Sequence, residues 1–178
     1  GNNRIELGSN ARAALNVAAG ATVLGGSGND TLVSGAGFSL AGSLQGGITT
    51  GGITLDGGAG TNTLAFQAAA ALVDSDFGKI RNIQSIVLSD LADSVVLGAN
   101  AQAAGFTNIA GGAGNDTLDA SGVTTGVTFV GGAGADSLLG GTATDSLVGG
   151  AGDDTYVVNN STDVVVEAAG EGKDLVVT

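Results

Sequence analysis

A run of three nine-residue units, Gly131–Val157, constrains the fold of this chain more than any other stretch. The units read GGAGADSLL, GGTATDSLV and GGAGDDTYV and follow one another without a gap. Each begins with Gly-Gly, has Asp at its sixth position and has a large apolar residue at its eighth. A short fixed period of this kind is typical of a solenoid, in which each repeat packs only on its neighbours.

Further copies of this unit lie on both sides of the tandem block. Three of them, GGSGNDTLV, GGAGTNTLA and GGAGNDTLD, begin at positions 25, 57 and 111. The copy at position 57 has Asn62 where the others have Asp. Two weaker copies follow the block in register and place Asp163 and Asp174 at the sixth position, whereas a degenerate copy before it has Val127 there.

Successive units are expected to lie on opposite edges of the solenoid, because alternate units are 18 to 20 residues apart, the length of one coil. The sixth positions then form two columns of unequal length. The longer contains Asp116, Asp136, Asp154 and Asp174, and the shorter contains Val127, Asp145 and Asp163. Side chains alternate along a strand, so the eighth position of each unit should point inward. The expected inward residues are Leu118, Phe129, Leu138, Leu147, Tyr156, Val165 and Val176.

The chemistry of the repeated turn favours a hard cation. Glycine adopts positive φ without steric cost, so a GGxG turn can direct several carbonyl oxygens to one point. Aspartate adds carboxylate oxygens, and such oxygens are the ligands that Ca²⁺ prefers. The chain has no His or Cys, which argues against zinc and other softer metals. The predicted calcium-site residues are Asp30, Asp116, Asp136, Asp145, Asp154, Asp163 and Asp174, with Gly112, Gly114, Gly132, Gly134, Gly150 and Gly152.

Charge repulsion within the columns strengthens this prediction. Neighbouring coils stack about 4.7 to 4.9 Å apart. Two carboxylates about 5 Å apart repel by roughly 3 kcal/mol at an effective dielectric constant near 20. A divalent ion between them converts this repulsion into attraction, and its binding free energy becomes folding free energy. We therefore expect the chain to be largely unfolded without calcium.

The tandem block resembles the RTX, or hemolysin-type, calcium-binding repeat, GGxGxDxUx, in which U is a large apolar residue. The units Gly131–Leu139 and Gly149–Val157 match every fixed position, and Gly149–Thr178 looks like the closing segment of such arrays. The resemblance implies an all-β fold, a right-handed parallel β-roll or β-solenoid with calcium in its glycine-rich turns. It also implies ions between turns two repeats apart, bound by the sixth-position Asp and loop carbonyls. The implied ion positions are between Asp116 and Asp136, Asp136 and Asp154, Asp154 and Asp174, and Asp145 and Asp163.

A longer duplication divides the chain into two predicted units. LGSNARAA at Leu7–Ala14 recurs as LGANAQAA at Leu97–Ala104, and a GNDTL turn follows each copy. We predict a degenerate, less regular solenoid unit over 1–90, with one or two RTX-like turns, and a calcium-binding β-roll unit over 91–178. Asn10 and Asn100 are expected to cap short helical turns. The repeat spacing alone does not show which turn lies beside the turn of Asp30.

The stretches between the motifs are less regular. Ser34–Gly52 is rich in Gly, Ser and Thr and is expected to form loops and weak strands. Gln67–Val73 is expected to form a short helix because of its alanines. Lys79–Ser89 is expected to form a strand because of its β-branched residues, with Lys79 and Arg81 on a solvated face.

Charge and composition exclude several classes of protein. The net charge is −12, with 17 acidic and five basic residues, which argues against binding nucleic acid or an anionic membrane. No stretch approaches the roughly 18 apolar residues of a membrane-spanning helix, so we expect no membrane insertion. The chain has no Cys and no Met, which fits a trimmed chain that folds outside the cell without disulfides.

Several alternatives fit parts of the pattern. A Gly-rich chain can be a flexible linker, but the eighth position is apolar in every copy. Asp also favours turns without a metal, and for Asp56, Asp90 and Asp93 we prefer that interpretation. An enzyme is not expected, because no nucleophile and base can be paired in a chain without His. The threonines form no regular column, which argues against an ice- or carbohydrate-binding face.

The predicted function is structural. The resemblance to RTX proteins implies type I secretion, with calcium as the partner that folds the chain outside the cell. We predict a segment of a secreted bacterial cell-surface protein, such as an adhesin, a surface-layer protein or a fibre. Self-association is expected, because the ends of a solenoid expose strands. The alternative is a secretion and folding module attached to a secreted enzyme such as a protease, lipase or epimerase.

Overall fold

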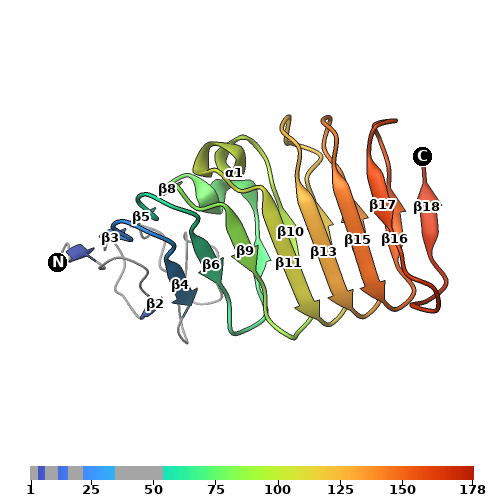
Figure 1. The fold of residues 1–178 in the computed structure, drawn as a ribbon, viewed down its shortest axis with the longest axis horizontal. Helices are drawn as coiled ribbons and strands as arrows, with labels where there is room; N and C mark the ends of the chain where they lie inside the picture. Colours follow the sequence, from blue (N-terminus) through green and yellow to red (C-terminus); the bar gives the residue numbers. More distant parts are fainter. Residues whose placement is uncertain (1–3, 7–11, 16–21, 35–53) are drawn as a thin grey trace.

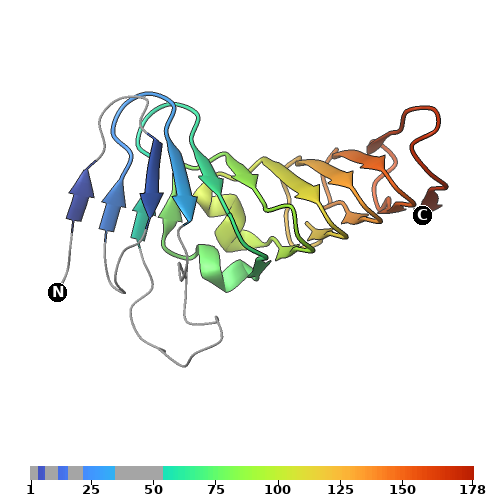
Figure 2. The ribbon, with the colours of Figure 1, turned by 90° about the horizontal axis from the view of Figure 1, so that it is seen from below.

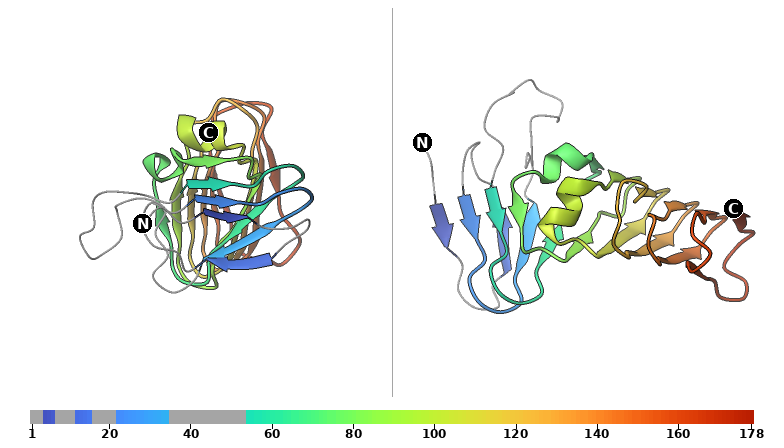
Figure 3. Two further views of the ribbon diagram at one scale, coloured as in Figure 1. Left: turned by 90° about the vertical axis from the view of Figure 1, so that its left-hand side faces the viewer. Right: turned by 90° about the horizontal axis from the view of Figure 1, so that it is seen from above.

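The computed structural model describes residues 4–6, 12–15, 22–34 and 54–178. This part of the chain is an all-β solenoid, in which short parallel strands stack coil upon coil along one axis (Figure 1). Figure 2 shows the rows of strands from a second direction, and the left panel of Figure 3 looks along the stack. The parallel β-solenoid that the repeat predicts is confirmed.

Three parallel sheets form the walls of the described solenoid. The long sheet consists of β2 (Arg12–Leu15), β4 (Thr31–Ser34), β6 (Thr63–Ala65), β9 (Ser85–Val87), β11 (Asn108–Ala113), β13 (Thr128–Ala133), β15 (Ser146–Ala151) and β17 (Val164–Val166). The N-terminal sheet consists of β1 (Arg4–Glu6), β3 (Thr22–Leu24), β5 (Thr54–Asp56) and β8 (Ile80–Arg81). The C-terminal sheet consists of β7 (Ala71–Leu72), β10 (Ser94–Val96), β12 (Thr117–Asp119), β14 (Ser137–Leu139), β16 (Thr155–Val157) and β18 (Leu175–Val177).

The strands of the C-terminal sheet show how the repeat builds the core. Most contain three residues, of which the middle one is buried and its neighbours are more exposed. Leu118, Leu138 and Tyr156 lie side by side in register and are fully buried. Because side chains alternate along a strand, one apolar residue per strand is enough to fill the narrow interior.

The predicted inward column is confirmed for most of its members. Leu118, Phe129, Leu138, Leu147 and Tyr156 are 0% exposed. Val165 is half-buried against this core. The prediction for Val176 is wrong, because this residue is 49% exposed. It lies on β18, the last strand of the C-terminal sheet, and no described coil packs over it.

The N-terminal sheet ends and the C-terminal sheet begins within one long coil between β6 and β9. This coil contains β7, the 3₁₀ helix η1 (Asp74–Phe77) and β8. The helix α1 (Ala99–Ala104) packs against η1 and β8. The buried rings of Phe77 and Phe106 meet nearly edge to face, with centroids 5.0 Å apart. This aromatic pair fills the core where the two sheets exchange.

Two local predictions in this coil are wrong. Ala71–Leu72 forms strand β7 instead of a helix, because it pairs with β10 and buries Leu72. The stretch Lys79–Ser89 is not one strand but two, β8 and β9, which belong to different sheets. Asn82, with a φ of 56°, makes the turn between them.

The duplicated LGxNAxAA motif folds differently in its two copies. In the second copy a helix forms as predicted, but its N-cap is Gly98 and not Asn100. The carboxylate of Asp74 accepts the N–H of Asn100 at 3.2 Å and that of Ala101 at 2.9 Å, which caps the helix from a neighbouring coil. In the first copy, residues 12–15 form strand β2, so the predicted helical turn is wrong there. Asn10 and residues 35–52 lie outside the described part of the chain.

The hydrogen-bonded sheets continue across residue 90. Strand β9 pairs with β6 on one side and with β11 on the other, and β10 pairs with β7. The described strands therefore form one stack on both sides of residue 90. The division of the chain into two units, 1–90 and 91–178, stays a prediction based on the repeated sequence.

Candidate metal centre

Five aspartates lie in successive coils where the chain turns into the C-terminal sheet. Each directly precedes a strand of that sheet, and the strand register places them at equivalent positions. We call this set the carboxylate column, and its members are Asp93, Asp116, Asp136, Asp154 and Asp174. Four of them are predicted calcium ligands that the repeat spacing had assigned to one edge.

One oxygen of each aspartate binds the backbone of the preceding coil. The Oδ1 atoms accept the N–H of the residue one step back in the column. These distances are 2.8, 2.7, 2.7 and 3.0 Å for Asp116, Asp136, Asp154 and Asp174. Asp93 Oδ1 accepts the N–H of Ala70 in the same way. The column is therefore a continuous ladder of side-chain to backbone hydrogen bonds.

The second carboxylate oxygen is different. The Oδ2 atoms of Asp116, Asp136 and Asp154 are buried and have no hydrogen-bond donor. A buried polar atom without a partner costs about 1–3 kcal/mol, and more when it is charged. A bound cation would remove this cost.

A backbone carbonyl oxygen lies close to two of these atoms, those of Asp116 and Asp136. A Cβ added at Gly131 would lie against Asp136 Oδ2 and 2.7 Å from the carbonyl oxygen of Gly149. A Cβ added at Gly111 would lie against Asp116 Oδ2 and 2.5 Å from the carbonyl oxygen of Gly131. A carboxylate oxygen and a carbonyl oxygen of the next coil thus converge beside a glycine. Two oxygen acceptors with no donor between them are ligands that suit Ca²⁺.

The six predicted glycines all have the backbone conformation that such turns require. Their φ angles lie between 99° and 136°, at Gly112, Gly114, Gly132, Gly134, Gly150 and Gly152. At Gly132 a Cβ would also collide with the carbonyl oxygen of Gly112 in the preceding coil. The turns stack closely because no side chain separates them.

Burial raises the pKa values of three carboxyls of the column, those of Asp116, Asp136 and Asp154. The pKa of Asp116 is raised to about 6, first by burial and then by the charges of Asp136 and Asp93, against the hydrogen bond from the Asp93 N–H. Burial is also the main cause that raises the pKa of Asp136 and of Asp154, with added repulsion from the next aspartate. The ionised column is therefore destabilised by desolvation and repulsion, both of which a cation would relieve.

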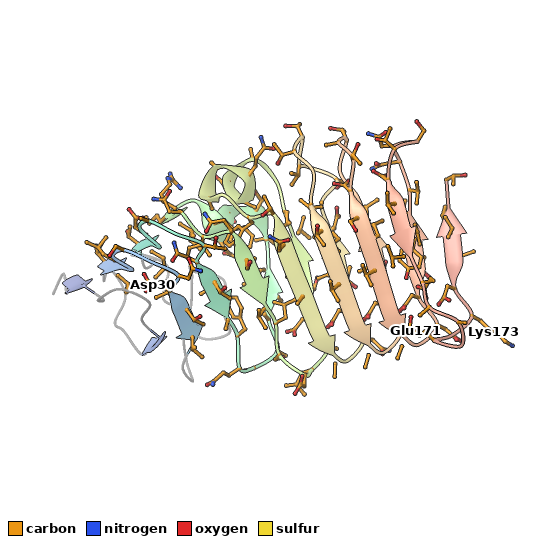
Figure 4. All side chains as sticks on the ribbon, viewed as in Figure 1. Asp30, Glu171 and Lys173 are labelled. Atoms are coloured by element: carbon orange, nitrogen blue, oxygen red, sulfur yellow. The ribbon has the colours of Figure 1, made fainter. Side chains whose placement is uncertain are left out.

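A second column lies where the chain turns into the long sheet. Its members directly precede β4, β6, β9, β11, β13, β15 and β17. We call it the mixed column, and it contains Asp30, Asn62, Gln84, Thr107, Val127, Asp145 and Asp163. Asp30, which is labelled in Figure 4, lies one coil from Asn62, whose Oδ1 accepts the Asp30 N–H at 2.9 Å.

Asp145 and Asp163 of the mixed column have a donor for each carboxylate oxygen, unlike Asp116, Asp136 and Asp154. Asp145 accepts the N–H of Val127 at 2.8 Å through Oδ1 and that of Gly141 at 2.6 Å through Oδ2. Asp163 accepts the N–H of Asp145 at 2.9 Å and that of Asn160 at 3.1 Å. Asp116, Asp136 and Asp154 therefore have an open carboxylate oxygen that Asp145 and Asp163 lack, and the ligand roles of Asp145 and Asp163 stay predictions.

Sequence reasoning assigned Asp93 to a solvated turn, and this is wrong. Asp93 is 3% exposed, and its Oδ2 accepts the N–H and the Oγ–H of Ser89, each at 3.0 Å. The sequence ADSVV at Ala92–Val96 repeats ADSLL at Ala135–Leu139, and this signal could have placed it in the column. The missing glycines of its turn concealed the match. Asp90 is exposed, and Asp56 accepts the N–H of Gly58 at 2.9 Å, as a turn residue does.

A second acidic residue was missed at the C-terminal end of the column. Oxygens of Asp154, Glu167 and Asp174 all lie within 4.8 Å of one another. Glu167 belongs to a two-residue insertion between nonapeptides, so the repeat pattern gave it no role.

A family model described as the RTX calcium-binding nonapeptide repeat matches this chain in four copies, over residues 22–39, 104–122 and 128–165. The chain carries RTX repeats. These nonapeptides bind calcium, and several of them imply several ions. No curated protein and no solved structure matches the chain.

The RTX matches agree with the two columns. They include the turns of Asp116, Asp136 and Asp154, and they leave out the turn in which Asn62 replaces Asp. The calcium prediction is confirmed at the level of the repeat, and the RTX β-solenoid is a structural calcium-binding fold. In the described part of the chain, no helix is both long enough and apolar enough to cross a membrane.

Proposed function

We propose that this RTX segment is a structural part of a secreted bacterial cell-surface protein and that it folds on extracellular calcium. The observation that carries the proposal is the set of buried, unpartnered Oδ2 atoms at Asp116, Asp136 and Asp154. Their turns belong to the matched RTX repeats. The function of the segment is then mechanical, because calcium converts a flexible acidic chain into a stiff rod.

Calcium would act on the contacts between coils. Asp136 Oδ2 belongs to one coil, and the facing carbonyl of Gly149 belongs to the next. An ion held by both joins the two coils across the turn. The same arrangement recurs with Asp116 and Gly131, so each ion adds to the stacking of its neighbours.

Circular dichroism in EGTA and in calcium tests the proposal. We expect little β-structure in EGTA, a cooperative gain of β-structure on adding calcium, and a much smaller gain with magnesium, which prefers rigid octahedral sites with bound water. Full β content in EGTA that does not change with calcium would overturn the proposal.

The finer role at the cell surface rests on the last coil. Val164, Leu175 and Val176 are 49–57% exposed on β17 and β18, the outermost strands of their sheets. Such strands offer both apolar side chains and an unpaired backbone edge, which a further coil or another chain can cover. This supports end-to-end assembly in an adhesin, surface layer or fibre. Sedimentation in millimolar calcium tests it, and a monomer at all concentrations would contradict assembly.

The alternative is a secretion and folding module beside a secreted enzyme. It predicts the same calcium response but a catalytic domain in the full-length protein. Further copies of the LGxNAxAA motif in that protein would instead favour the surface role. The full-length sequence therefore separates the two.

A further inference from the structure

The carboxylate column ends in a turn with a different ligand set. Strand β15 pairs with β17 so that Val148 lies opposite Val166. The next residue is Gly149 in one coil and Glu167 in the following coil. Inner turns have a glycine at this position, which offers only a carbonyl oxygen. The last turn places the carboxylate of Glu167 there. Figure 4 labels two other residues of this turn, Glu171 and Lys173.

Four side-chain oxygens converge at this turn. Carboxylate oxygens of Asp154, Glu167 and Asp174 lie within 4.8 Å of one another. A Cβ added at Gly149 would meet Asp154 Oδ2, the Tyr156 hydroxyl and Glu167 Oε1, the last at 2.7 Å. The Tyr156 hydroxyl donates to Glu167 Oε1 and holds this carboxylate in place.

One buried oxygen in this cluster lacks a partner. Asp154 is 1% exposed, and its Oδ2 has no hydrogen-bond donor. The exposed carboxylates of Glu167 and Asp174 lie within 4.8 Å of Asp154 and of each other. The cluster therefore combines an unsatisfied buried oxygen with two further negative charges.

We propose that Asp154, Glu167 and Asp174 form a three-carboxylate cation site that closes the carboxylate column. The proposal rests on the calcium-binding function and adds to it a ligand outside the nonapeptide. Calcium is the natural occupant. More carboxylates favour a higher charge on the ion, so a trivalent lanthanide should bind here in preference to the inner turns.

Terbium luminescence tests the site, because the ring of Tyr156 lies beside it and can transfer excitation to a bound Tb³⁺ ion. Tyr156 is the single tyrosine of a chain without tryptophan, so excitation through an aromatic ring reports ions beside this turn. We expect tyrosine-sensitised emission from the calcium-free full chain on adding Tb³⁺, and its competitive loss with excess calcium. Tyr156→Phe should abolish the sensitised emission while directly excited Tb³⁺ still binds.

Glu167→Gln is the decisive variant, and Glu171→Gln is its matched control. Both remove one charge from the same loop, and glutamine keeps the acceptor for the Tyr156 hydroxyl at 167 and for the Ala168 N–H at 171. Glu167→Gln should weaken Tb³⁺ binding by roughly tenfold or more, since affinity follows the number of charged ligands. Glu171→Gln should leave it nearly unchanged.

The outcomes separate this inference from the proposed function. Equal Tb³⁺ titrations for Glu167→Gln and the parent chain overturn the site, whatever the circular dichroism shows. No calcium response by circular dichroism in the parent chain overturns the proposed function instead. If Glu167→Gln folds poorly, the Tb³⁺ emission lifetime of the parent chain decides. A lifetime typical of a mostly dehydrated ion supports three carboxylate ligands, and that of a largely hydrated ion contradicts them.

Discussion

The turns of Asn62 and Asp136 make the same hydrogen bond to the preceding coil, one with an amide side chain and the other with a carboxylate. In both, a side-chain oxygen accepts the backbone N–H of the preceding coil, at 2.9 Å for Asn62 and 2.7 Å for Asp136. The difference lies in the second side-chain atom. Asn62 Nδ2 donates to the carbonyl oxygen of Asn82 at 2.9 Å. Asp136 Oδ2 faces the carbonyl oxygen of Gly149 with no donor between them.

The comparison shows what calcium replaces. Beside Gly57, the space holds the Asn62 amide and the Asn82 carbonyl, which satisfy each other. Beside Gly131, the same space holds two acceptors. An amide N–H₂ thus does within the protein what a cation does between a carboxylate and a carbonyl. A solenoid can therefore have coils that need calcium and coils that do not, built on one backbone geometry.

Substitutions at Asp136 should have the largest effect on the stability of the solenoid. Asp136→Ala removes both the acceptor for the Asp116 N–H and the calcium ligand, and should cost about 3 kcal/mol of calcium-loaded stability. Asp136→Asn keeps the acceptor, and its Nδ2 can donate to the Gly149 carbonyl. In EGTA, where the parent chain is expected to have little β-structure, this variant should keep more of it, because its turn no longer holds two unpaired acceptors. Urea unfolding in calcium measures the first effect and circular dichroism in EGTA the second, and equal β-structure of Asp136→Asn and the parent chain in EGTA would break the comparison.

The reverse exchange at Asn62 should have a smaller effect, because one turn is changed in a mostly neutral part of the mixed column. Asn62→Asp places a carboxylate oxygen against the Asn82 carbonyl and should cost about 1–3 kcal/mol while the new site is empty. The variant should therefore need more calcium to fold, by circular dichroism. Saturating calcium should restore most of this loss and bind one more ion, by isothermal titration calorimetry. A loss that calcium leaves unchanged would mean that the turn needs more than a carboxylate to hold the ion.

Acid should have the smallest effect, and Asp116 of the carboxylate column should contribute to it. The folded-state pKa of Asp116 is raised to about 6 by burial and by the neighbouring charges, whereas its unfolded value is about 3.9. The folded state therefore binds the proton more tightly, so calcium-free stability falls as pH rises through this window. Circular dichroism in calcium-free buffer should show more β-structure near pH 5 than near pH 7. Asp116→Asn should reduce this difference, and β-structure that increases toward pH 7 would contradict the assignment.

The nonapeptide spacing was sufficient to predict most of the carboxylate column. Its turns lie 18 to 20 residues apart, so counting residues places Asp116, Asp136, Asp154 and Asp174 in one line. Counting fails in the N-terminal part, where Asp30 and Asn62 are 32 residues apart and Asn62 and Gln84 are 22 apart. Coils of unequal length carry no period, and only the strand register shows which turns lie together.

Other failures have local causes. The alanines near Ala71 favour a helix, but pairing with β10 and burial of Leu72 outweigh a propensity of a few tenths of a kcal/mol. Asp93 was missed because its turn lacks the glycines that mark the others. Glu167 was missed because it lies in an insertion, where only the folded chain brings it to Asp154.

The ladder of the carboxylate column has a direction. Every hydrogen bond in it runs from a backbone N–H to an aspartate in the coil that follows in the sequence. A chain that leaves the ribosome or crosses an export channel N-terminus first therefore exposes turns whose acceptors have not yet emerged. Each coil is completed by its successor, so truncating the final turn leaves the Asp154 N–H without its acceptor. An added coil at the N-terminal end would find its acceptor already in place.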